Sequence, residues 1–197
     1  NIENQTMAEG IKKSLSKQKK IIVKNTKTSD RRMKPKAPFT TASLQQTAYS
    51  SLGFSVRQTS SIAQRLYQGL QLGGDNVVGL ISYMRTDSTT LSKDCLNDID
   101  DYLSKNYPQF KSQDERKYSK KVKNAQEAHE AIRPTSINNT PEKVKQYLEE
   151  QEYKLYDLIW KRTVASQMTD AVYNQVTLEF DLSNEYEFRY SGSFLKE

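Results

Sequence analysis

Apolar residues recur at helical spacing through most of the chain and at strand spacing near its C-terminal end. The four-residue repeat from Met7 to Leu15 places one apolar face on a helix over residues 7–16. Residues 21–23 form a short β-prone run. Residues 24–38 are polar and basic and include two prolines, so they predict a linker or an exposed crossing between domains.

Two capped helices are predicted next. Thr40 or Thr41 caps a helix that Gly53 ends, and Ser55 caps the helix that follows. Two helices joined by such a short turn resemble a helix-turn-helix or winged-helix element. The first helix has an apolar face of Leu44, Ala48, Tyr49 and Leu52, and the second carries the apolar residues Val56, Ala63, Leu66, Tyr67 and Leu70.

The following patterns alternate between strand and helix. A short buried strand is predicted over residues 77–83, after a glycine-rich turn. Ser88 is placed to cap a helix over residues 89–104, and the polar residues 105–124 predict a surface loop. Residues 140–168 begin with a Thr-Pro pair and predict one kinked helix or two consecutive helices.

The apolar period changes beyond this last predicted helix. Apolar and polar residues alternate on both sides of a Ser183-Asn184 turn, which predicts an antiparallel hairpin. We therefore expect an α+β fold. A mainly helical insert, residues 38–169, would be carried on a β-containing domain formed by both chain ends, residues 1–37 and 170–197.

The formal net charge is +6, and basic residues are concentrated near the N-terminal end. Eleven lysines and arginines lie between Lys12 and Lys36, with Asp30 as the one acid among them. This segment fits either contact with the phosphates of a nucleic acid or a solvated, mobile basic stretch.

The single cysteine, Cys95, excludes an internal disulfide and a cysteine-based zinc site within this chain. We expect it to fill an apolar helix face. The apolar stretches are too short to span a membrane, so a reducing, cytoplasmic setting is expected. The chain starts with Asn and ends inside a strand pattern, which predicts a piece of a longer protein.

The most specific chemistry in the chain lies in the run Gly79-Leu80-Ile81-Ser82-Tyr83-Met84-Arg85-Thr86-Asp87-Ser88. Residues two apart in an extended segment point the same way, so Tyr83 and Arg85 would face one site. A phenol oxygen can attack a phosphodiester, and a guanidinium holds a phosphate through two hydrogen bonds. The alternative is a packed strand tyrosine beside a surface arginine.

The only histidine, His129, lies in the run Glu127-Ala128-His129-Glu130-Ala131-Ile132-Arg133-Pro134-Thr135. His129 and Arg133 are four apart and would share one face of a helical turn that Pro134 ends. On chemistry alone, a packed or surface histidine is the more frequent outcome.

At these residues the sequence resembles the type IA DNA topoisomerases, and in particular the bacterial topoisomerase I branch. Four segments match in the family's order: Pro38-Phe39-Thr40-Thr41-Ala42-Ser43-Leu44-Gln45-Gln46, Ala63-Gln64-Arg65-Leu66-Tyr67, the Tyr83 run and the His129 run. The resemblance implies that the helical insert is the domain III of these enzymes and that the chain ends are part of domain II.

The resemblance also implies site residues. Tyr83 matches the family's nucleophile, which forms a 5′-phosphotyrosyl bond with one DNA strand so that a second strand can pass. Arg85 matches the arginine that engages the scissile phosphate. His129 matches a histidine that contacts a DNA phosphate near the cleavage site, with Arg133 in a supporting role. Gln64 matches a glutamine near the nucleotide-binding groove.

Further implications concern the DNA site, the metal and the partners. Thr86, Asp87 and Ser88 match the end of the tyrosine motif and are expected to organise the DNA site. The family's Toprim domain, whose acidic residues bind Mg²⁺, has no counterpart in the chain, so no metal ligand is expected here. The implied partners are DNA in the bacterial nucleoid, single-stranded at the cleavage site and duplex for passage, and the Toprim and other domains of the same polypeptide. The chain alone is expected to be inactive.

Two other functions also fit the residues. A topoisomerase III-like decatenase usually has proline between the tyrosine and the arginine, where this chain has Met84. A non-catalytic DNA-binding module would hold DNA through helices and basic segments, with Tyr83 only packing. Affinity for DNA is expected in every case. A covalent adduct separates the enzymes from the non-catalytic module, and relaxation compared with decatenation separates the two enzymes.

Overall fold

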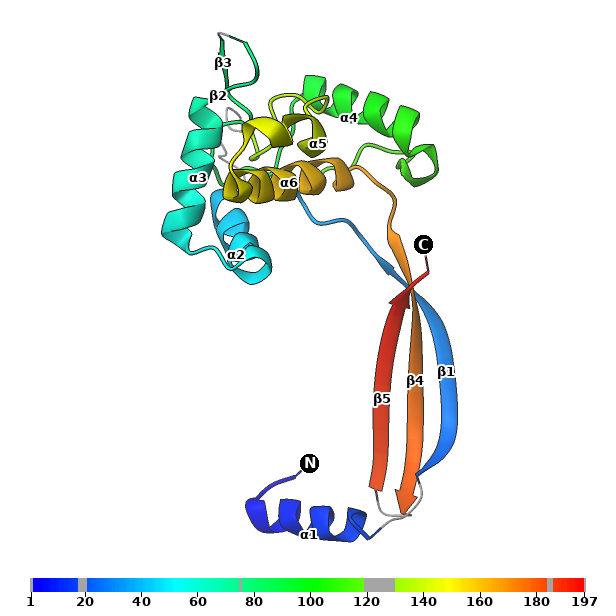
Figure 1. Ribbon diagram of the computed structural model, residues 1–197. Coiled ribbons are helices and arrows are strands. Elements are labelled where there is room, and N and C mark those ends of the chain that lie inside the picture. Colours follow the sequence, from blue (N-terminus) through cyan, green and yellow to red (C-terminus); the bar gives the residue numbers. More distant parts are fainter. Residues whose placement is uncertain (1, 18–20, 75, 119–129, 184–185, 197) are drawn as a thin grey trace, which may run out of the picture. The chain divides into compact units, whose positions relative to one another are not determined.

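The computed structural model describes residues 2–17, 21–74, 76–118, 130–183 and 186–196 (Figure 1). The chain divides into two compact units. One consists of Asn1–Lys34 together with Asp170–Glu197, and the other is Pro35–Thr169.

The first unit is a three-stranded antiparallel sheet preceded by a helix. Helix α1 spans Gln5–Leu15, and Asn4 caps it by accepting a hydrogen bond from the amide of Met7. The strands lie in the order β1-β4-β5, as the long arrows of Figure 1 show. Their bounds are Ile22–Met33, Ala171–Ser183 and Tyr186–Leu195. The predicted hairpin is therefore present, while its turn at Asn184 lies outside the described residues.

Strand β1 corrects the expectation of a linker over residues 24–38. It pairs with β4 continuously from Ile22 opposite Asp181 to Met33 opposite Ala171, apart from one bulge. All of its residues are exposed, so it lacks the alternation of buried and exposed positions by which a strand is predicted. A polar, charged sequence is typical of an edge strand, because it discourages pairing with another chain.

Cross-strand neighbours give the sheet two unlike faces. Phe180 lies opposite Phe188, and Leu178 opposite Tyr190. Glu179, between Phe180 and Leu178, points to the other face, because successive strand residues alternate. Its carboxylate accepts hydrogen bonds from three side chains, at 3.1 Å, 3.2 Å and 3.1 Å, belonging to Asn25, Lys27 and Arg189. A polar ladder thus lines the face opposite the aromatic residues.

The second unit is mainly helical. Its α-helices are α2 (Thr41–Leu52), α3 (Val56–Gln68), α4 (Lys93–Asn106), α5 (Pro141–Val144) and α6 (Glu150–Ala165). Its short elements are β2 (Leu70–Gln71), β3 (Val77–Val78), η1 (Pro108–Phe110) and η2 (Lys145–Tyr147). Helix α3 packs against α2 and α6. The molecule is α+β, as expected from the sequence.

Local signals fixed the α2–α3 pair. Thr40 and Ser43 form a capping box at the start of α2, Gly53 ends that helix at φ +72°, and the Ser55 side chain caps α3. The prediction of an inward-facing Tyr49 was wrong, since its side chain is 69 % exposed. It lies one residue beyond buried Ala48, about 100° around the helix from the buried stripe.

The core of this unit lies between the helices and the extended segments that connect them. Its fully buried side chains include Phe39, Leu66, Leu80, Ile81, Ile99, Leu103, Ile132, Ile137, Leu155, Tyr156 and Ile159. Several come from stretches that are neither helix nor strand, so the tyrosine run and the segment 130–135 are built into the core rather than looped over it.

Three predicted segments differ in part from the structure. Only Val77–Val78 of the expected strand 77–83 is a strand, paired with β2. Helix α4 is capped by Ser92, not Ser88, because the carbonyl of Thr90 accepts the amide of Ala131 and keeps the chain extended there. The expected loop 105–124 contains the 3-10 turn η1, and its residues 119–124 lie outside the described part of the chain.

Candidate active site around Tyr83

The residues just before Tyr83 are attached to two other segments. The amide of Leu80 donates to the carbonyl of Leu66 at 2.8 Å, at the C-terminal end of α3. The amide of Ser82 donates to the carbonyl of Arg133 at 2.8 Å, and the amide of Thr135 donates to the carbonyl of Leu80 at 3.0 Å. The approach to Tyr83 is therefore fixed by α3 on one side and by residues 133–135 on the other.

The residues just after Tyr83 are attached to the first turn of α2. The Thr41 hydroxyl lies 2.8 Å from the carbonyl oxygen of Met84 and accepts the amide of Thr86 at 2.9 Å. In return, the Thr41 amide donates to the carbonyl of Thr86 at 2.8 Å. One threonine thus holds the backbone on both sides of Arg85.

Burial alternates along this segment. Met84 and Thr86 are buried, whereas Tyr83, Arg85 and Asp87 are exposed. Tyr83 retains 47 % of its accessible surface. The phenol and the guanidinium therefore lie on the exposed side of the same extended stretch, as the spacing of the two residues predicted.

Arg85 lies at the edge of two hollows. One is formed at the start of α2 by Thr40, Thr41, Ala42, Arg85, Thr86 and Asp87. The other lies between α2 and α3 and is lined by Thr41, Leu44, Gln45, Thr59, Ser60, Ala63, Gln64, Met84 and Arg85. The structure thus places Gln64 and Arg85 in one hollow, which has hydroxyl and amide groups on its walls and apolar side chains between them. Asp87 lines the other hollow with Arg85.

Thr86 and Ser88 organise the backbone after Arg85. The Ser88 amide donates to the Thr86 hydroxyl at 3.0 Å, and the Thr90 amide donates to the Ser88 hydroxyl at 3.1 Å. Each of these bonds closes a short turn, in which a side-chain hydroxyl accepts the backbone amide two residues later. The Thr86 and Ser88 hydroxyls are thus engaged by the chain's own backbone, which fits a role in shaping the segment.

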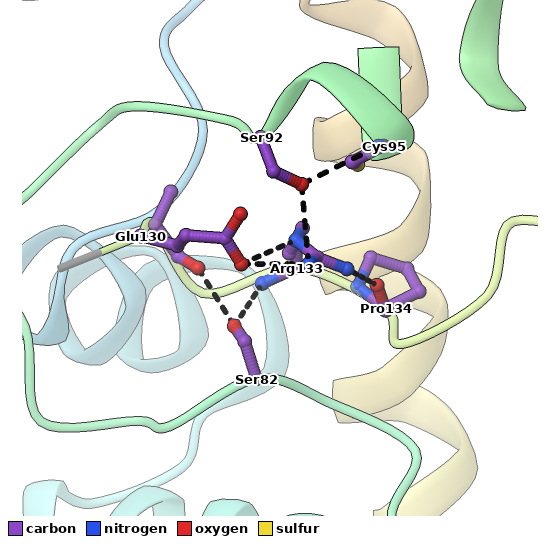
Figure 2. Close-up of polar contacts among 7 residues, drawn as sticks. Ser82, Ser92, Cys95, Glu130, Arg133 and Pro134 are labelled. Carbon is purple, nitrogen blue, oxygen red and sulfur yellow. Dashed lines mark hydrogen bonds and ion pairs between the residues drawn. The ribbon is translucent and has the colours of Figure 1, made fainter. Parts of the chain in front are cut away.

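Arg133 is engaged inside the fold (Figure 2). Its guanidinium donates to the Glu130 carboxylate at 2.6 Å and 3.0 Å and to the Pro134 carbonyl at 2.9 Å, and it lies 3.4 Å from the Ser92 hydroxyl. Its side chain is 17 % exposed. Arg133 is therefore positioned to join the segment 130–134 to the N-terminus of α4.

The predicted helical turn over residues 129–133 is wrong for its described part. Ile132 is bridged to Phe39 and Pro134 to Ile81, so residues 130–134 are extended. The Ser82 hydroxyl completes the arrangement. It accepts the amide of Arg133 at 3.0 Å, as Figure 2 shows, and donates to the carbonyl of Ala131 at 2.7 Å. His129 lies outside the described residues.

Tyr67, one of the apolar residues of the second predicted helix, lies at the site. Its side chain is 40 % exposed, and its ring centroid is 5.4 Å from that of Tyr83. The helical period near the end of α3 does not separate a core residue from one at the rim of the core. The signal in the sequence that points to Tyr67 is the motif Ala63-Gln64-Arg65-Leu66-Tyr67, in which it stands three residues after Gln64.

Within the described ranges, no three or more side chains of His, Cys, Asp or Glu gather as a metal site. Asp87 is the one carboxylate that lines the hollows beside Arg85. Cys95 is buried, and burial raises the pKa of its thiol to about 11. No helix among the described residues is long and apolar enough to cross a membrane.

The chain is similar to known proteins along its whole length. A family model described as DNA topoisomerase matches residues 1–197. The chain is 46 % identical over 177 residues to DNA topoisomerase 1 of Xylella fastidiosa (strain Temecula1 / ATCC 700964) and 46 % identical over 196 residues to DNA topoisomerase 1 of Rickettsia prowazekii (strain Madrid E). The chain belongs to the bacterial type IA DNA topoisomerases.

The relatives are much longer than this topoisomerase chain. The two alignments cover 89 % and 98 % of the chain but 22 % and 25 % of the relatives, so it spans about a quarter of their length. The fold is also similar to full-length topoisomerase I from Thermotoga maritima in a monoclinic crystal form, with a TM-score of 0.74 and 36 % sequence identity. That match covers 96 % of this chain and 30 % of the other.

Proposed function

We propose that the full-length protein relaxes negatively supercoiled DNA by cutting one strand transiently, with Tyr83 as the nucleophile. The observation that carries the proposal is the pairing of exposed Tyr83 and Arg85 on one side of a segment whose intervening and following residues are buried. Membership in the type IA topoisomerase family supports it.

The proposed reaction exchanges one phosphodiester for another. The Tyr83 phenol oxygen attacks the phosphorus, the bond from phosphorus to the 3′ oxygen breaks, and that oxygen leaves as a 3′ hydroxyl after taking up a proton. The phenol loses its own proton as the new bond forms. The product is a 5′-phosphotyrosyl link, and attack of the 3′ hydroxyl on it restores the strand and frees Tyr83. Because bond number and type are conserved, the cycle needs no ATP.

Arg85 is the proposed phosphate-binding group. A guanidinium can donate two parallel hydrogen bonds to phosphate oxygens and stays charged throughout the reaction. The hollow between α2 and α3 that Arg85 shares with Gln64 is the proposed place for the adjoining nucleotide. Asp87 lines the hollow at the start of α2 together with Arg85, while Thr86 and Ser88 hold the backbone that carries them.

The remaining elements of the site stay proposals from the family resemblance. We propose that Mg²⁺ is bound by acidic residues of a Toprim domain elsewhere in the polypeptide, and that His129 contacts a phosphate near the cleavage site. Arg133, with its guanidinium on Glu130, acts by holding the segment that follows His129. The chain alone is expected not to relax DNA, because those other groups are required.

Replacement of Tyr83 in the full-length protein tests the proposal. A single-stranded oligonucleotide labelled at its 3′ end is incubated with the protein and Mg²⁺, and the protein is then denatured. The wild type should retain the label covalently, because the 5′ end of the labelled fragment is the one attached. Tyr83→Phe should retain none, whereas Tyr49→Phe, which alters an exposed tyrosine of α2, should behave as wild type. An adduct in Tyr83→Phe would refute the assignment.

The same protein separates the alternatives. A topoisomerase I relaxes supercoiled plasmid far better than it unlinks catenated circles, and a topoisomerase III-like decatenase shows the reverse preference. Met84 between the tyrosine and the arginine and the names of the relatives favour the first. A non-catalytic module would bind DNA in a salt-dependent way and give no adduct from the wild type.

A further inference from the structure

We propose that Tyr67 is a positioning residue that orients the phenol of Tyr83, an inference that rests on the function proposed for Tyr83. The two ring centroids are 5.4 Å apart and the ring planes are inclined by 66°, which is an edge-to-face pair. Such pairs are attractive because the positive edge of one ring meets the negative face of the other. The contact therefore favours one orientation of Tyr83 over its alternatives.

Tyr67 is held firmly enough to act as a reference point. It lies in the last turn of α3, directly after Leu66, whose side chain is fully buried. The Leu66 carbonyl accepts the amide of Leu80 at 2.8 Å, which binds the end of α3 to the start of the tyrosine segment. A Cβ atom at Gly79 would lie 2.7 Å from the carbonyl oxygen of Tyr67, so the two backbones touch there.

Tyr83 has the opposite character. Its backbone neighbours are anchored through Ser82 and Met84, but it belongs to neither a helix nor a strand and its side chain is 47 % exposed. Burial therefore does not determine the direction of the ring. Packing of the Tyr83 ring against Tyr67 would raise the fraction of molecules in which the Tyr83 phenol oxygen is aimed at the phosphate. This changes the rate of cleavage rather than the affinity for DNA.

The test compares Tyr67→Leu with Tyr67→Phe in the full-length protein, with Tyr49→Leu as a matched control at an exposed tyrosine. Cleavage is measured in a single turnover with a labelled oligonucleotide and Mg²⁺. The dissociation constant of the same oligonucleotide is measured in a Tyr83→Phe background, where no cleavage interferes. We expect Tyr67→Leu to slow cleavage by roughly fivefold to tenfold with an unchanged dissociation constant. Tyr67→Phe, which keeps the ring, and Tyr49→Leu should cleave at nearly the wild-type rate.

Three results would overturn the inference. Cleavage by Tyr67→Leu at the wild-type rate would show that the ring pair does not matter. Equal slowing by Tyr67→Phe would show that the hydroxyl acts instead of the ring. A dissociation constant that rises in proportion to the loss of rate would make Tyr67 a DNA contact.

Two further measurements distinguish a failure of the role proposed for Tyr67 from a loss of folding and from a failure of the function proposed for Tyr83. If Tyr67→Leu lowers the unfolding midpoint, Tyr67→Met takes its place, because methionine keeps more of the side-chain volume without a ring. Its cleavage rate and its dissociation constant are then measured in the same way. A wild-type protein that forms no adduct would contradict the function proposed for Tyr83. A normal adduct in the wild type with an unaffected Tyr67→Leu rate would contradict only the role of Tyr67.

Discussion

The Nε atom of Arg65 lies 2.9 Å from Oε1 of Glu152, a carboxylate that is only 2 % exposed. The other oxygen of Glu152 accepts the amide of Glu149 and so completes the capping box of α6. Arg65 also donates to the exposed carboxylate of Glu149 at 3.0 Å. This arginine thus joins α3, which carries Gln64 and Tyr67, to the start of α6.

Removal of the Arg65 charge should destabilise the helical unit. Arg65→Met would leave the buried carboxylate of Glu152 without its cation, and an unpaired buried charge is costly. We expect the thermal midpoint to fall by roughly 5 °C, as followed by circular dichroism. Glu149→Gln removes only the exposed partner and keeps an oxygen for the cap, so it should change the midpoint little. Equal losses in the two variants would contradict a special role for the buried pair.

Thr41→Val should impair both stability and cleavage. The substitution keeps the shape of the side chain but leaves the amide of Thr86 without its acceptor, which costs about 2 kcal/mol in a buried setting. Because the same hydroxyl holds the backbone around Arg85, the adduct should also form more slowly. Thr47→Val, which removes a hydroxyl bonded only one helical turn back, is the control. Urea unfolding and the adduct assay of both variants check the prediction.

Gly79 should tolerate no side chain. An alanine Cβ there would lie 2.7 Å from the Tyr67 carbonyl oxygen, so α3 and the tyrosine segment would have to separate. We expect Gly79→Ala to lower the free energy of unfolding by about 2 kcal/mol and to reduce adduct formation. Gly74→Ala is the matched control, since a Cβ at that position meets no atom within 4 Å. A fully stable and active Gly79→Ala protein would show that the contact is easily relieved.

The sheet should lose stability in acid through Glu179. The hydrogen bond from Asn25, followed by that from Lys27, lowers the pKa of this carboxyl in the folded chain. A lowered folded-state pKa means that the stabilisation is complete above the ordinary carboxyl pKa of about 4.3 and is lost as the pH falls through the lower folded-state value. The protection factors of the β1 and β4 amides, measured from pH 6 downward, should therefore fall on the acid side (roughly below pH 4).

Glu179→Gln should remove most of that acid-dependent change while leaving the pairing of the strands intact. Glu3→Gln, which removes a carboxylate before α1, controls for the change in net charge. If the acid-dependent change in exchange of β1 and β4 persisted in full in Glu179→Gln, the polar ladder would not be its source.

The sequence alone determined the features that depend on a few neighbouring residues. The capping box of Thr40 and Ser43, the left-handed Gly53 and the Ser55 cap define α2 and α3 locally. The shared direction of Tyr83 and Arg85 follows from the geometry of an extended chain. These signals survive folding because no distant partner competes for the same groups.

Only the tertiary structure decided the features that require distant partners. Strand β1 shows no burial period and is a strand because β4 satisfies its backbone. The extended course of residues 130–134 replaces the expected turn because Phe39 and Thr90 accept the amides of Ile132 and Ala131. Tyr67 reaches Tyr83 because Leu66 and Leu80 share a hydrogen bond across the intervening chain. A backbone group can be satisfied by many partners, so the sequence pattern does not fix which partner it takes until the core packs.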